Sequence, residues 1–144
     1  ISGVTFTKEN DYWRFVVDNN EFLTQYNPEE VASIPYLSYL TLQDYRDKPL
    51  YFVGESGEHT IELERNFGGR FVLRMSEACV EGEICNNDLP LKNCTRDNLV
   101  VYKKVIENET ETIYQEDKCT YIHALTEHQA QYADVFLYKL LGLR

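Results

Sequence analysis

The stretch LVVYKKVIENETETIYQEDKCTYIHALTEHQAQYADVFLYKLL, residues 99–141, decides the fold expected for this chain. Its first part predicts strands over 99–106, 112–116 and 119–125, because short apolar segments are separated by polar turn residues. Its last part predicts a helix near 127–141 that starts at a Thr126–Gln129 capping box and stops at Gly142. Between these ends the apolar residues recur at helical spacing. The stretch therefore indicates strands closed by a helix that packs on them.

Upstream, the sequence alternates between further strands and turns. Strands are expected over 12–17, 21–26, 50–53, 58–64 and 70–75. In the fourth of these, Ile61 and Leu63 would lie on one face and the glutamates on the other. Asn27-Pro28-Glu29-Glu30 predicts the start of a short helix near 28–34, since Asn can cap it and Pro suits its first position. Pro35 would end it.

Size and composition restrict the class of protein. The 144 residues suit one domain over 1–144. The apolar share of 43% excludes a disordered chain, and no apolar run approaches the roughly 18 residues of a membrane span. The net charge of −10, from 24 acidic and 14 basic residues, disfavours nucleic acid and anionic membranes as partners. Its physical complement is a cationic partner, although such a charge also serves solubility alone.

Four cysteines occupy the second half of the chain: Cys79, Cys85, Cys94 and Cys119. They allow three connectivities and contain no Cys-x-x-Cys metal pair. We favour Cys79–Cys85 with Cys94–Cys119, because this pairing would pin the long polar loop 79–98 at both ends. Four reduced, buried thiols are the alternative.

Two glycosylation sequons favour a secreted protein. Asn93-Cys94-Thr95 and Asn108-Glu109-Thr110 both lie in expected loops. The chain starts at Ile1 without a signal peptide, so we expect either a mature protein or the excised part of a longer precursor.

The sequence favours binding over catalysis, with no cofactor and no metal site. His59, His123 and His128 share no spacing typical of ligands or a catalytic dyad. Ser56 lies in Gly-Glu-Ser-Gly, which lacks the Gly-x-Ser-x-Gly spacing of a nucleophile elbow and indicates a turn. A carboxylate pair among the many acidic residues stays open, but none can be singled out.

Acidic clusters are the candidate binding residues. Glu58, Glu62 and Glu64 would share one strand face. On the next strand, Arg70 could pair with Glu64 and Arg74 with Glu62, which would neutralise much of this face. The second cluster surrounds the hairpin after residue 106. The full candidate set is Glu58, Glu62, Glu107, Glu109, Glu111 and Glu116.

Three stretches carry a family resemblance: residues 57–75 (GEHTIELERNFGGRFVLRM), the cysteine-bearing loop that follows, and residues 132–144 (YADVFLYKLLGLR). They resemble the carboxy-terminal SECRET domain of orthopoxvirus secreted tumour-necrosis-factor receptor homologues. The resemblance implies a β-sandwich of two mostly antiparallel sheets within a longer receptor-like precursor. It also implies secretion and the sequestration of basic host chemokines. No contact residue of that family can be matched to this chain.

A lipocalin-like extracellular carrier of a small ligand is the competing interpretation. It too would be strand-rich, disulfide-linked and closed by a helix, with its aromatic side chains turned into a barrel.

Overall fold

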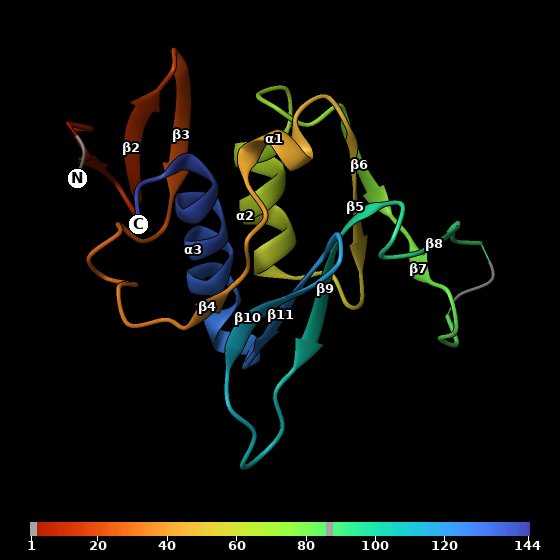
Figure 1. Ribbon diagram of the computed structural model, residues 1–144. Helices are drawn as coiled ribbons and strands as arrows, with labels where there is room; N and C mark the ends of the chain where they lie inside the picture. The colour runs from red at the N-terminus through yellow and green to blue at the C-terminus, as the bar shows by residue number, and fades with distance from the viewer. Residues whose placement is uncertain (1–2, 86–87) are drawn as a thin grey trace.

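Two helices, α2 (Glu58–Phe67) and α3 (Gln129–Leu141), lie between two β-sheets in the computed structural model, which describes residues 3–85 and 88–144 (Figure 1). A three-stranded antiparallel sheet covers one side of the helices, in the order β1-β2-β3. A six-stranded sheet covers the other side, in the order β4-β10-β11-β9-β5-β6. The strands of these two sheets are β1 (Thr7–Glu9), β2 (Tyr12–Val17), β3 (Asn20–Thr24), β4 (Tyr36–Leu37), β5 (Pro49–Val53), β6 (Arg74–Glu77), β9 (Asn98–Lys104), β10 (Thr112–Glu116) and β11 (Cys119–Ala124).

Short elements complete the chain. A one-turn helix, α1 (Leu42–Tyr45), precedes β5, and a 3-10 turn, η1 (Thr126–His128), leads into α3. The parallel pair β7 (Cys79–Val80) and β8 (Leu91–Lys92) lies outside the large sheet.

The expected sandwich of mostly antiparallel sheets is not what the strands form. In the large sheet only β10 and β11 pair antiparallel, whereas β5–β6, β5–β9, β9–β11 and β4–β10 are all parallel. Parallel neighbours need a crossover connection, and α2 supplies the one between β5 and β6. The two larger sheets therefore pack on the helices rather than on each other.

Residues 58–64 are the clearest error of the sequence prediction, because they begin helix α2 instead of forming a strand. Leu63 is buried on this helix while Ile61 is 59% exposed, so the two do not share a face. The hydroxyl of Thr60 accepts a hydrogen bond from the Gly57 N–H at 2.8 Å, which satisfies an amide at the start of the helix. The alternation of polar and apolar residues over 58–64 is too short to distinguish the two-residue period of a strand from the 3.6-residue period of a helix.

The expected helix near 28–34 is also absent from the structure, although its start signal forms. The Asn27 N–H donates to Glu30 at 2.8 Å, and the Glu30 N–H donates to the Asn27 side chain at 2.9 Å. Only single turns follow, closed by bonds such as Ala32 N–H to the Glu29 carbonyl at 3.3 Å. Pro35 stops the chain before a helix with continuous i→i+4 bonds can build up.

Most of the deciding stretch behaves as expected, but the expected Thr126–Gln129 capping box does not form, because residues 126–128 make the 3-10 turn η1 and α3 begins at Gln129 without a side-chain cap. Strands β9, β10 and β11 and the closing helix α3 fall on the predicted segments. Gly142 ends α3 with a φ of 74°, the left-handed conformation that favours glycine.

Both favoured disulfides are present. Cys79 is bonded to Cys85 and Cys94 to Cys119, with Cα–Cα distances of 5.9 and 5.0 Å. The described residues between Cys79 and Asn98 include the short strands β7 and β8, where we expected only a polar loop.

Candidate functional site

Three parallel strands bring three loops to one edge of the large sheet. Strands β5, β9 and β11 run in the same direction, so the loops 54–57, 105–111 and 125–128 all follow their carboxyl ends. This edge lies at the bottom of Figure 1, where the β9–β10 loop projects from the molecule. Ligands of sheets with parallel strands and helices characteristically bind outside the carboxyl ends of the strands.

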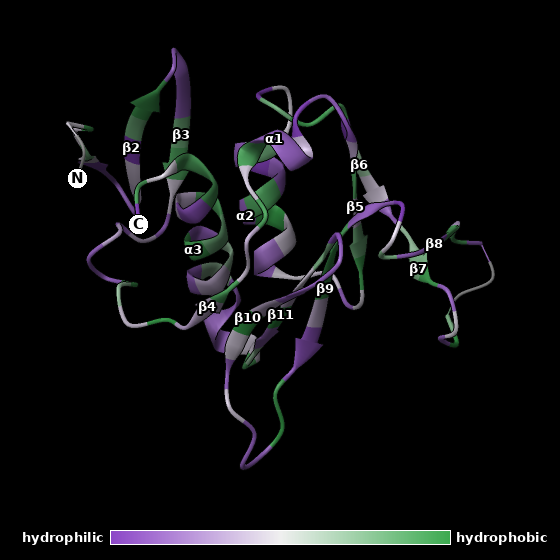
Figure 2. Ribbon diagram, in the orientation of Figure 1, coloured by the Kyte–Doolittle hydropathy of each residue, from purple (hydrophilic) through white to green (hydrophobic). Residues whose placement is uncertain are grey.

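Carboxylates gather on these loops and on the first residue of α2. We call this set the acidic edge: Glu55, Glu58, Glu107, Glu109, Glu111 and Glu127. Lys103 and Lys104, at the hydrophilic end of β9 in Figure 2, are the nearest bases along the chain. Burial lowers the pKa of the His59 ring at the start of α2, so this histidine adds little positive charge at neutral pH.

An open depression lies in the acidic edge, with a volume of about 720 Å³. Glu55, Glu58 and Glu127 line it together with Ser56, Gly57, Thr126 and Gln129. The described lining thus contains three carboxylates and no lysine or arginine, and a cation entering it would be attracted from several sides.

Gly57 allows the two helix starts to approach each other at the floor of the depression. A Cβ at this position would lie 2.2 Å from the side-chain oxygen of Gln129, far below contact distance. A larger residue at position 57 would therefore displace the Gln129 side-chain amide, which packs against the β5–α2 loop at the start of α3.

Two members of the acidic edge are held by internal hydrogen bonds. Glu111 accepts from the Leu125 N–H at 2.8 Å and pairs with Nδ1 of His128 at 2.8 Å, which ties the β9–β10 loop to the start of α3. Glu109 accepts from the Ile106 N–H at 2.8 Å and lies 3.5 Å from Nε2 of His123. Their carboxylates fix the shape of the edge as well as contributing charge.

The structure separates the six candidate residues of the sequence analysis. Glu58, Glu107, Glu109 and Glu111 meet at the acidic edge, even though α2 replaces the expected strand. Glu116 ends β10, which runs antiparallel to β11, so it lies at the opposite end of the sheet. Glu62 is only 1% exposed and cannot contact a partner. Glu127 belongs to the edge but was interpreted from sequence only as part of a helix cap.

Glu62 instead belongs to a buried carboxyl pair with Asp134. The Glu62 carboxylate lies 2.5 Å from Arg65 and accepts from the Gln25 N–H at 2.8 Å. Asp134 accepts from the Tyr26 N–H at 3.1 Å. Burial and the neighbouring Glu62 carboxylate raise the pKa of Asp134 well above its ordinary value. The pair joins α2 and α3 to the end of β3, so its role is structural.

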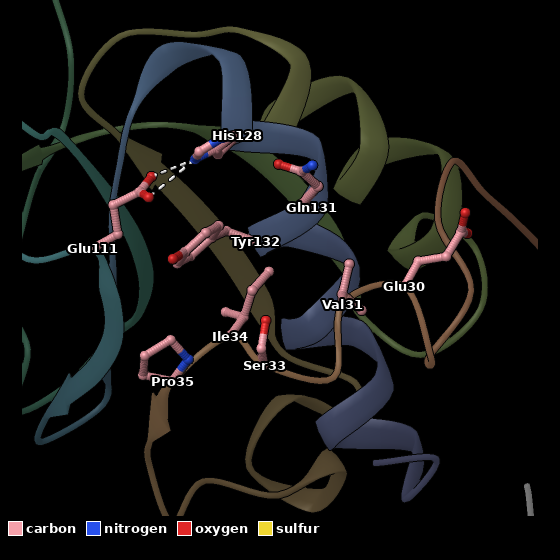
Figure 3. Close-up of a pocket in the computed structure, with 9 residues that line it drawn as sticks. All are labelled: Glu30, Val31, Ser33, Ile34, Pro35, Glu111, His128, Gln131 and Tyr132. Atoms are coloured by element: carbon pink, nitrogen blue, oxygen red, sulfur yellow. Dashed lines mark hydrogen bonds and ion pairs between the residues drawn. The ribbon is translucent and has the colours of Figure 1, made fainter.

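A second cavity, of about 240 Å³, lies behind the Glu111–His128 pair (Figure 3). The turns over 30–35 form one wall, and Gln131 and Tyr132 of α3 form another. The imidazole of His128 faces Glu111 in this view. His128 is not among the described residues that line the depression of the acidic edge.

The two sequons differ in accessibility. Asn108 is exposed on the β9–β10 loop. Asn93 is half-buried, its side-chain nitrogen donates to Glu81 at 3.2 Å, and Cys94 beside it is in a disulfide. A glycan at Asn108 would stand on the acidic edge itself.

No known protein family, curated protein or solved structure matches this chain. Nothing in these comparisons identifies the chain as a SECRET domain, and the helix layer between the two larger sheets differs from the sandwich that the resemblance implies. Within residues 3–85 and 88–144, no helix is long and apolar enough to cross a membrane. The same residues contain no group of three or more His, Cys, Asp and Glu side chains arranged to hold a metal ion.

Proposed function

We propose that this chain is a secreted binding domain that captures a basic protein at its acidic edge, with host chemokines as the partner class that the resemblance implies. The observation that carries the proposal is the depression of about 720 Å³ where Glu55 and Glu58, from the β5–α2 connection, lie together with Glu127 of η1. The carboxylates lie on the ends of packed strands and helices, so they are positioned before the partner arrives. Capture needs no cofactor and blocks whatever surface of the partner it covers.

The covalent structure supports an extracellular location. Both pairs of cysteines form disulfides, which persist in oxidising compartments and are rare in the cytosol. The exposed sequon at Asn108 is in a position that glycosylation in the secretory pathway could use.

The lipocalin-like alternative requires strands that close into a barrel around the ligand. The large sheet is open, with β4 and β6 at its edges, and the described strands close into no barrel. The aromatic side chains that would line a barrel, such as Phe15, Phe67 and Phe136, pack with the helices in the core.

Charge reversal tests the proposed site. We expect the double variant Glu107→Lys/Glu127→Lys to slow association with a basic chemokine by about 3- to 10-fold, because exposed charges at an interface mainly affect encounter. Both side chains are exposed, so the fold should be kept. Surface plasmon resonance against a chemokine panel at low and high salt measures the rate and its screening.

The control is Glu116→Lys, which reverses one charge instead of two at the opposite end of the sheet. Lysozyme and cytochrome c serve as basic proteins that are not chemokines. If Glu116→Lys slows association as much as the double variant does, the protein attracts its partner by net charge and the acidic edge is not the site. Equal binding to every basic protein would remove chemokines as the specific partner class.

Acyl hydrolysis is the second candidate, and the position of Ser56 favours it. Ser56 lies in the turn between β5 and α2, the place where α/β-hydrolases carry their nucleophile. Glu111 follows β9 and His128 follows β11, which gives the same chain order of serine, acid and histidine. The 2.8 Å contact between Glu111 and Nδ1 of His128 is the kind that orients a catalytic imidazole.

The triad is not assembled, however, and this places hydrolysis second. The Ser56 hydroxyl donates to Glu77 at 3.3 Å, and Ser56 and His128 line different cavities. Incubation with a fluorophosphonate probe should therefore give no covalent adduct. An adduct that is lost in Ser56→Ala and kept in Ser76→Ala would reverse the order of the two candidates.

A further inference from the structure

An apolar groove adjoins the acidic edge on the face of the large sheet that the helices do not cover. Its volume is about 390 Å³. Val53 of β5 and Val101 of β9, paired in register, lie beneath it with Ala78. These residues belong to a second apolar cluster, separate from the core around the helices. Ile84 and Leu89 form the outer wall, and the Ile84 side chain is fully exposed.

The covalent and hydrogen-bond structure holds this wall in place. The Cys79–Cys85 disulfide anchors the residue that follows Ile84. The Cys79 N–H donates to the Pro90 carbonyl at 2.9 Å, and the Glu83 N–H donates to the Val80 carbonyl at 3.2 Å. The exposed isoleucine is therefore presented by a braced segment, and burying it against a partner would cost little additional ordering.

Charge at the rim indicates what the groove would accept. Glu55 and Glu83 line the groove, and Glu55 also lines the depression of the acidic edge. Among the described residues that line the groove, the one base is Lys103, whose ammonium lies 5.3 Å from the centre of the Tyr121 ring. If a partner places an apolar side chain in the groove, the residues next to it in the partner's sequence would therefore lie within reach of these carboxylates.

We propose that the groove and the acidic edge together bind one extended segment of a partner protein, in which a single large apolar residue is flanked by lysines or arginines. This inference rests on the proposed function and specifies the chemistry that the site recognises. The apolar residue is seated between the sheet and Ile84, and the flanking cations face Glu55, Glu58 and Glu83. Net charge alone would attract any basic segment regardless of its sequence. The groove adds a requirement for an apolar residue at one position of the segment.

Two capped peptides test the proposal: Arg-Arg-Leu-Arg-Arg and Arg-Arg-Ser-Arg-Arg. We expect the leucine peptide to bind about 10- to 30-fold more tightly, the gain expected from burying most of a leucine side chain. Isothermal titration calorimetry of the full chain measures both affinities. Ile84→Ser should abolish the difference, while Leu73→Ser, a similar change at a residue 62% exposed just before β6, should keep it.

Each outcome separates this proposal from the proposed function. Equal, salt-sensitive binding of the two peptides would overturn the groove proposal and leave capture by the acidic edge intact. A preference for leucine that survives Ile84→Ser would place the apolar contact elsewhere and also overturn it. Binding of dodecanoate that depends on Ile84, without any preference for the leucine peptide, would assign the groove to small apolar molecules instead. If the basic proteins themselves do not bind, the proposed function fails.

Discussion

Replacing Phe136 with alanine is expected to lower the free energy of unfolding by about 3–5 kcal/mol. The side chain is fully buried in the middle of α3. Its ring centre lies 5.6 Å from that of Tyr45 and 5.5 Å from that of Phe67, so it joins three helices in the core. Since α3 is packed between two sheets, the cavity cannot collapse without moving one of them.

Urea denaturation followed by circular dichroism measures this loss. Tyr39→Ala is the matched control, because it also removes a large aromatic side chain but from a position that is 95% exposed. The control should change stability by less than about 0.5 kcal/mol. A Phe136→Ala protein as stable as the control would show that α3 does not occupy the centre of the core.

Removing Glu62 is expected to have an effect of similar size for an electrostatic reason. Glu62→Ala removes the buried carboxylate that accepts from the Arg65 guanidinium and from the Gln25 N–H. Loss of one partner of a buried ion pair costs about 3–5 kcal/mol, and we expect the lower end of this range because the Arg65 side chain is 23% exposed and still donates to the Leu23 carbonyl. Glu64→Ala, at an exposed position of the same helix, should be nearly neutral.

Asp134 makes the stability of this buried pair depend on pH. The ordinary pKa of an aspartate is 3.8, and the pKa of Asp134 is raised well above it in the folded protein. Above pH 3.8 the folded state therefore keeps a proton that the unfolded chain releases. The contribution is fully present below that value and is lost as the pH rises towards the raised pKa. The slope reaches about 1.4 kcal/mol per pH unit at most.

Asp134→Asn is the variant that isolates this effect. Asparagine has nearly the same shape and does not titrate, so its stability relative to the wild type should increase between pH 4 and the raised pKa. Denaturation of both proteins at a series of pH values measures the difference. A constant difference across the range would mean that Asp134 is not the titrating group.

Local sequence signals determined the carboxy-terminal half of the fold. The strands of residues 98–124 and helix α3 follow from their own residues, because each is long or bounded by strong turn and capping signals. Of the three possible disulfide connectivities, the one that we favoured because it pins the 79–98 loop at both ends is the one that forms. The acidic character of the surface is a property of composition and needed no structure.

Only the tertiary structure decided which strands run parallel. The direction of the strands in turn decided which glutamates come together at the acidic edge. Residues 58–64 carry a pattern compatible with both periods, and the packing of Leu63 and Phe67 in the core selects the helix. The resulting β5–α2–β6 crossover makes β5 and β6 parallel. Pairing between distant segments then sets β9 and β11 beside β5, which brings Glu58, Glu107 and Glu127 to one edge and leaves Glu116 at the other. The positions of these strands along the sequence do not indicate which of them become neighbours in the sheet, because strand order depends on hydrogen bonds between residues far apart in the chain.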